Sequence, residues 1–168
     1  MKQVVADSST LITLLDTDNF NLLFKLFDEI IITNEVYKEI TNKNQHKLTI
    51  DTYIKHEKRF YQSITYDEFY EILIKRLDRG ESESIVLAKR IKLPLLIDEK
   101  KGRSVAKSLG IGIVGLIGIL LKLIDSKKIT KNRAIEIINE VEANKFRLSD
   151  NLKVLDYEFD YAKKSFNS

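Results

Sequence analysis

Short apolar runs that alternate with helical patterns constrain the fold more than any other feature of this sequence. The runs cover residues 3–6, 29–33, 95–97 and 111–113, and apolar residues at helical spacing follow each of them. Strands that are apolar throughout and alternate with helices are typical of parallel sheets whose two faces are both covered. We therefore expect an α/β fold built on a central, mainly parallel sheet.

The helical patterns indicate which segments cover that sheet. Helices are expected at residues 11–15, 22–27, 34–40, 67–77, 81–91, 101–109, 116–124, 131–143 and, at the C-terminus, 149–168. The polar, lysine-rich stretch 42–64 is expected to be a variable helical segment, and Gly110 is expected to end the helix at 101–109. Because no linker rich in Pro, Gly or Ser interrupts the chain, residues 1–168 are expected to form a single domain.

The residue types that are present limit the chemistry. The 168 residues include no cysteine and only two histidines, His46 and His56, which excludes disulfides, thiolate zinc sites, iron–sulfur clusters and cysteine nucleophiles. Both histidines stand among polar residues and are expected to be exposed. Polar chemistry must therefore come mainly from carboxylates.

Charge and hydropathy indicate a cytoplasmic protein. The formal net charge of +3 is a mild surplus that neither requires nor excludes a polyanionic partner. The longest apolar run, 111–121, is well short of the roughly 20 residues that span a bilayer. Asp7 interrupts the apolar stretch near the N-terminus, so neither a secretory signal nor membrane attachment is expected.

Acidic residues follow the expected strands at positions suited to function. Asp7 and Asp98 come directly after strands, where parallel α/β sheets place their functional crevice. Glu39 lies on the helix after the second strand, and Glu81 lies in the first turn of a later helix. Each has a structural explanation when taken alone, because Asp is favoured at helix N-caps, glutamates are ordinary on helix surfaces, and the helix dipole favours Glu81 in a first turn. Their joint arrangement favours a functional site.

Four motifs, in order and at the right separations, resemble those of PIN-domain proteins, in particular a branch allied to the VapC-type toxins. They are VVADSSTLITL, EVYKEI, LDRGESESIVLAKR and PLLIDEKKGRSVAKSLG, and the resemblance extends to FRLSDNL at residues 146–152. The resemblance implies a three-layer α/β/α fold and a metal-dependent ribonuclease. It also implies products with a 5′-phosphate and a 3′-hydroxyl.

The resemblance carries over to particular residues of this chain. The acidic positions that it implies are Asp7, Glu39, Glu81 and Asp98, joined by Ser9 in the same turn as Asp7. Glu35 is the alternative to Glu39, and Glu99 is expected to assist Asp98. Clustered carboxylates repel one another unless a cation neutralises them, and their hard oxygen ligands suit Mg²⁺ or Mn²⁺. The expected reaction is in-line hydrolysis of RNA by metal-activated water.

Basic residues are concentrated around Asp98. Arg103 lies one turn beyond it, and Lys100 and Lys101 stand between the two. A basic rim beside an acidic centre suits a phosphodiester substrate, because the rim holds backbone phosphates. These residues are therefore candidates for RNA binding, and an ordinary solvated helix face is the alternative.

Aromatic residues gather in the middle of the chain. They are Tyr53, Phe60, Tyr61, Tyr66, Phe69 and Tyr70. They are candidates for a base-stacking surface or a groove for a partner helix, although core packing is favoured. If the protein is a toxin, an antitoxin segment is expected to bind here, and the resemblance also implies that the chain can form a homodimer.

The glycine-rich stretch 110–115 matches the pattern GxGxxG, but a helix rather than a strand is expected before it, which argues against a dinucleotide site. Close packing is the better explanation of these glycines. Val114 and Leu116 stand where PIN proteins are expected to have threonines. This difference keeps open the alternative of a catalytically weak PIN module that binds RNA or a protein partner.

Overall fold

The computed structural model describes residues 2–56 and 61–144. The motif at 146–152 and the helix expected at 149–168 lie outside the described residues. Within the described part, no helix is long and apolar enough to cross a membrane.

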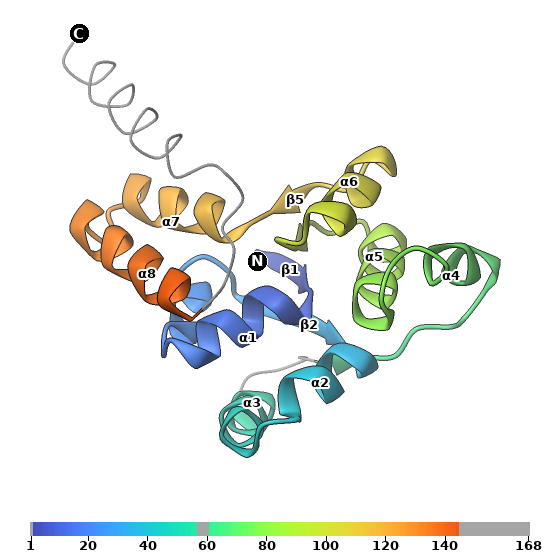
Figure 1. Cartoon of the computed structure of the whole chain (residues 1–168), viewed down its shortest axis with the longest axis horizontal. Coiled ribbons are helices and arrows are strands. Elements are labelled where there is room, and N and C mark those ends of the chain that lie inside the picture. Colours follow the sequence, from blue (N-terminus) through green and yellow to red (C-terminus); the bar gives the residue numbers. More distant parts are fainter. Residues whose placement is uncertain (1, 57–60, 145–168) are drawn as a thin grey trace, which may run out of the picture.

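A five-stranded sheet forms the centre of the molecule (Figure 1). Its strands are β1 (Gln3–Ala6), β2 (Glu29–Thr33), β3 (Tyr61–Gln62), β4 (Leu95–Leu96) and β5 (Ile113–Val114). They lie in the order β3-β2-β1-β4-β5, and each neighbouring pair is parallel. The expected α/β fold with a parallel sheet is therefore confirmed.

Helices cover both faces of this sheet. They are α1 (Ser8–Asp16), η1 (a 3-10 helix, Phe20–Lys25), α2 (Asn34–Thr41), α3 (Asn44–His56), α4 (Glu68–Leu73), α5 (Arg79–Ile91), α6 (Lys100–Ser108), α7 (Leu116–Asp125) and α8 (Lys131–Ala143). Figure 1 shows α4, α5 and α6 on one side of the strands and α1, α7 and α8 on the other. The molecule has the three layers, α/β/α, that the resemblance implied.

Alternation of side chains along the strands explains the two apolar cores. Val4 and Ala6 of β1 belong to the core beneath α1, α2, α3, α7 and α8, whereas Val5 belongs to the core beneath α4, α5 and α6. The residues of β2 divide in the same way. Because both faces are buried, residues 4–6 of β1 and residues 30–32 of β2 are continuous apolar runs rather than alternating patterns.

Residues 42–64 differ from the expectation of a single helical segment. Helix α3 ends at His56, and β3 follows and pairs with the end of β2. The strand has only two residues, Tyr61 and Gln62, and they lack the apolar run that revealed the other strands. Pairing with β2, rather than local sequence, therefore defines this strand.

The last strand begins two residues later than expected, at Ile113, because the chain as far as Ile111 still closes the C-terminus of α6. Gly110 has a positive φ of 73° and ends the helix as expected, and the Ile111 amide then donates to the carbonyl of Ala106. Strand β5 can therefore begin only after this closing hydrogen bond.

The expectation that His46 is exposed was wrong. Its side chain lies on the same face of α3 as Ile50, and both residues are buried. The ring Nε2 lies 3.0 Å from Oδ1 of Asp16 at the end of α1. Polar sequence neighbours on the outer face of the helix concealed this inward position.

Candidate functional site

Three of the predicted acidic residues meet at the edge of the sheet where β1 ends. Asp7 follows β1 and caps α1, Glu39 lies on α2, and Glu81 lies in the first turn of α5. Burial, and to a lesser extent the charge of Asp7, raises the pKa values of both glutamates, so the three groups lie within electrostatic reach of one another. We call Asp7, Glu39 and Glu81, together with Asp78, the carboxylate cluster.

Asp7 is buried and held by one of its two oxygens. The amide and the hydroxyl of Ser9 both donate to Oδ2, at 3.3 and 2.8 Å. The other oxygen, Oδ1, is buried without a hydrogen-bond partner among the described residues. Burial raises the pKa of Asp7, although the hydrogen bonds from Ser9 oppose this effect. Ser9 thus orients Asp7.

Glu39 fits into a space that a glycine provides. Its carboxylate accepts a hydrogen bond from the side chain of Ser8 at the start of α1. Its two oxygens would lie 2.6 and 2.7 Å from a Cβ atom added to Gly80 on α5. Burial, and then the charges of Asp78 and Asp7, raise the pKa of Glu39.

Glu81 has the most perturbed ionisation in the cluster. Burial, assisted by the charges of Asp78 and Asp7, raises the pKa of Glu81 to about 7. Its Oε1 is buried without a hydrogen-bond partner among the described residues and would lie 2.7 Å from a Cβ atom on Gly102. A carboxylate in this position gains from protonation or from a neighbouring cation.

Asp78 is the member of the cluster that the sequence reasoning missed. Its side chain caps α5 by accepting a hydrogen bond of 2.8 Å from the Glu81 amide. Its charge adds to the effect of burial in raising the pKa values of Asp7, Glu39 and Glu81. The spacing Asp-x-x-Glu before an apolar helix is a recognisable N-terminal signal and could have revealed it.

Asp98 is held by a different set of groups. Its Oδ2 accepts hydrogen bonds of 2.9 Å from the Thr10 hydroxyl on α1 and from the Leu116 amide at the start of α7. Its Oδ1 lies 3.7 Å from Nη1 of Arg103. Asp98 thus caps α7 across the sheet rather than the helix that follows it, and its carboxylate already has protein partners.

The remaining predicted residues surround these two groups. Glu99 caps α6, and its charge contributes to raising the pKa of Glu81. Lys100 and Lys101 are exposed in the first turn of α6. Glu35, the alternative to Glu39, forms a salt bridge of 3.1 Å with Lys38, and its charge reaches Glu39. Glu39 is the one that faces Asp7.

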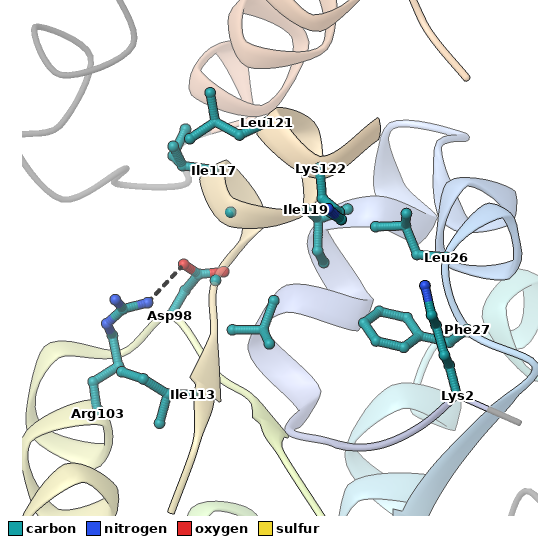
Figure 2. Close-up of a pocket in the computed structure, with 13 residues that line it drawn as sticks. Lys2, Leu26, Phe27, Asp98, Arg103, Ile113, Ile117, Ile119, Leu121 and Lys122 are labelled. Atoms are coloured by element: carbon teal, nitrogen blue, oxygen red, sulfur yellow. Dashed lines mark ion pairs between the residues drawn. The ribbon is translucent and has the colours of Figure 1, made fainter. Parts of the chain in front are cut away.

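Asp98 and Arg103 also form one end of a largely apolar cavity of about 540 Å³. Figure 2 shows the ion pair at that end, and Lys2, Leu26 and Phe27 at the other. Gly115 lies beside the pair, and a Cβ atom added to it would meet both Arg103 and Asp98. The close-packing explanation of the glycine-rich stretch holds for this position.

The chemistry of the cluster fits a hard cation. Carboxylate oxygens are the ligands that Mg²⁺ and Mn²⁺ prefer, and the unpaired oxygens of Asp7 and Glu81 are the atoms that a cation would neutralise. With the side chains as they lie, however, no three His, Asp or Glu residues within 2–56 and 61–144 could hold a metal ion together. Binding therefore requires the cluster's side chains to converge.

Comparisons with known proteins agree with this architecture. A model of the PIN-domain family DUF3368 matches residues 3–155. No curated protein sequence matches the chain. Among solved structures, the chain is similar to a PilT N-terminus domain protein from the hyperthermophilic archaeon Sulfolobus solfataricus P2, with a TM-score of 0.51 and 18% identity. The similarity covers 71% of this chain and 92% of the archaeal chain, and it shows the fold alone.

Proposed function

The chain belongs to the PIN-domain family, which has a nuclease-type fold, and from this premise we propose that it is a metal-dependent endoribonuclease. The observation that carries the proposal is the carboxylate cluster, which combines mutual repulsion with unpaired, buried oxygens on Asp7 and Glu81. Such an arrangement is unfavourable for the isolated protein and becomes favourable when a cation binds.

Asp7, Glu39 and Glu81 would hold Mg²⁺ or Mn²⁺ in this proposal. The bound ion would lower the pKa of a coordinated water and stabilise negative charge on the phosphodiester. Neighbouring residues of the chain position these ligands and control access to them. Ser9 orients Asp7, Asp78 holds the first turn of α5 that carries Glu81, and the carboxylate cluster repels other anions until the cation is present.

In this proposal, basic residues of α6 bind the phosphates of the RNA substrate. Arg103 is oriented by Asp98 and by a hydrogen bond of 3.2 Å from its Nη1 to the Ile97 carbonyl. Lys100 and Lys101 are exposed on the same helix and can follow the phosphates of a flexible strand. Asp98 is a positioning residue here, because it joins Arg103, α1 and the start of α7.

A role as the cytoplasmic toxin of a toxin–antitoxin pair extends this proposal. It is supported by the resemblance of the motifs to VapC-type toxins and would add an antitoxin and a second copy of the chain as partners. The second candidate function is a catalytically weak module that binds RNA or a protein. Val114 and Leu116 favour this candidate, because apolar side chains replace the expected threonines near Asp98.

Cleavage of a mixed RNA panel tests the proposed function. With Mn²⁺, we expect the purified protein to cut single-stranded RNA and leave 5′-phosphates, and we expect EDTA to abolish the cleavage. The Asp7→Asn variant, which keeps an N-capping side chain, serves as the control and should be inactive. Cleavage that survives EDTA or the substitution would come from a contaminant, and RNA binding without cleavage would favour the second candidate.

Gly80→Ala is expected to lower activity without unfolding the protein. The added Cβ would collide with the Glu39 carboxylate, which is the end of a flexible side chain and can move away. A displacement of about 1 Å in a catalytic group lowers rates by roughly a hundredfold. Alanine also favours the helix by about 1 kcal/mol over glycine, so the melting temperature should not fall appreciably.

Gly118→Ala on α7 is the matched control for Gly80→Ala. An added Cβ there comes no closer than 3.9 Å to a neighbouring atom, a Val114 side-chain carbon. Cleavage rates and thermal melts of both variants should show a loss confined to Gly80→Ala. Equal activity of the two variants would mean that the position of Glu39 is unimportant.

A further inference from the structure

Tyr66 is oriented in the opposite way to an ordinary surface tyrosine. Its side chain is 57% exposed, yet its hydroxyl donates a hydrogen bond of 2.7 Å to Oε1 of Glu83, which is only 1% exposed. Surface tyrosines usually bury the ring and leave the hydroxyl in water, because the ring is the apolar part. Here the hydroxyl forms its hydrogen bond inside the protein, and the apolar ring faces solvent.

The Tyr66 ring is held firmly in this position. The ring of the buried Tyr70 packs against it, with centroids 4.6 Å apart and planes at 51°. The segment before α4 is fixed to α5, because Arg90 donates to the Thr65 carbonyl and forms an ion pair with Asp67. A ligand that stacks on the ring would therefore not have to order it first.

Glu83 connects this ring to the helices that carry Glu39 and Glu81. It follows Glu81 by two residues on α5, and its second oxygen accepts a hydrogen bond of 3.1 Å from the Glu35 amide in the first turn of α2. Helix α2 carries Glu39. One buried side chain thus fixes Tyr66 to the two helices that carry Glu39 and Glu81.

Cations follow this aromatic pair along the chain. Lys75, Arg76 and Arg79 are exposed in the segment that leads from α4 into α5, and the charge of Arg79 reaches the Tyr70 hydroxyl. Exposed aromatic rings combined with positive charge are the features by which proteins bind single-stranded nucleic acid, since rings stack on bases and cations hold phosphates.

We propose that the exposed ring of Tyr66 is a stacking platform for an unpaired base of the RNA strand whose phosphodiester lies at the carboxylate cluster. This inference rests on the proposed ribonuclease function and adds a residue that selects unpaired bases. Stacking on a tyrosine is independent of base identity, so the platform selects single strands over duplexes without reading a sequence.

Two substitutions separate the ring from its hydroxyl. Tyr66→Phe and Tyr66→Ala both lose the hydrogen bond to Glu83, but only Tyr66→Ala loses the ring. We would measure their affinities for a labelled 12-nucleotide single-stranded RNA by fluorescence anisotropy, with Mg²⁺ present and in a Glu81→Gln background that blocks cleavage. The alanine variant should bind about tenfold more weakly than the phenylalanine variant.

An abasic strand of the same length gives the second measurement. Without bases to stack, the two variants should bind it equally. In the otherwise wild-type protein, Tyr66→Ala should raise KM for RNA cleavage and leave kcat nearly unchanged. Equal affinities of the two variants for the base-bearing RNA would overturn the inference while leaving the nuclease intact. Absence of both RNA binding and cleavage in the wild-type protein would instead overturn the proposed function.

Discussion

Replacing Glu81 with glutamine is expected to lower the rate of RNA cleavage about a thousandfold. At the same time, it should stabilise the metal-free protein above neutral pH. Glutamine keeps the shape of the side chain and removes its charge. Cleavage is lost because the cation loses a ligand. Stability is gained because the repulsion from Asp78 and Asp7, and the unfavourable burial of the anion, both disappear.

The direction of the pH effect follows from the raised pKa of Glu81. In the unfolded chain the group has its usual pKa of 4.5, whereas in the fold the pKa is about 7. Below pH 4.5 both states are protonated, and as the pH rises towards 7 the folded state retains a proton that the unfolded state has lost. Stability therefore decreases through this range, by on the order of 3 kcal/mol for this group.

Denaturant unfolding in EDTA at several pH values between 4 and 8 tests this prediction. The wild-type protein should lose stability as the pH rises, and Glu81→Gln should lose less. Glu83→Gln is the matched control, because Glu83 is also buried on the same helix but accepts hydrogen bonds from the Tyr66 hydroxyl and the Glu35 amide. That substitution should destabilise the protein. If Glu81→Gln also destabilised it, the carboxylate would already be compensated and would need no cation.

Local sequence pattern was sufficient for most of the fold. The runs at 3–6 and 29–33 have continuous apolar centres, at 4–6 and 30–32, because helices cover both faces of β1 and β2, so the pattern itself indicates a parallel sheet. The same reasoning failed for β3, whose two residues gain their strand conformation from pairing with β2. A strand of two residues is too short to show a local sequence pattern, so its pairing with a distant strand cannot be predicted from its own residues.

The candidate site was predictable only in part, for the same reason. Position after a strand indicated Asp7, position on the helix after a strand indicated Glu39, and position in a first helical turn indicated Glu81. The structure brings these three residues together. Asp98 has the same local signal as Asp7. Its partners, however, come from Thr10, which is 88 residues away in the sequence, and from the Leu116 amide. Which donors reach a carboxylate depends on packing that local spacing does not encode.

Asp98→Ala should therefore have an effect opposite to that of Glu81→Gln, and should lower the stability of the metal-free protein by about 2–4 kcal/mol. The substitution leaves the Leu116 amide and the Thr10 hydroxyl, both fully buried, without their acceptor. It also removes the group that faces Arg103. Denaturant unfolding in EDTA at pH 7 measures the loss.

Asp98→Asn is the control that separates hydrogen bonding from charge. Its amide oxygen, in the place of Oδ2, can still accept from both the Leu116 amide and the Thr10 hydroxyl, so its stability should stay within about 1 kcal/mol of the wild type. Cleavage by this variant should still fall strongly, because Arg103 loses its charged partner. If alanine at this position were tolerated as well as asparagine, the hydrogen bonds of Asp98 would contribute nothing to the fold, and its carboxylate would be free to serve the cation together with Asp7 and Glu81.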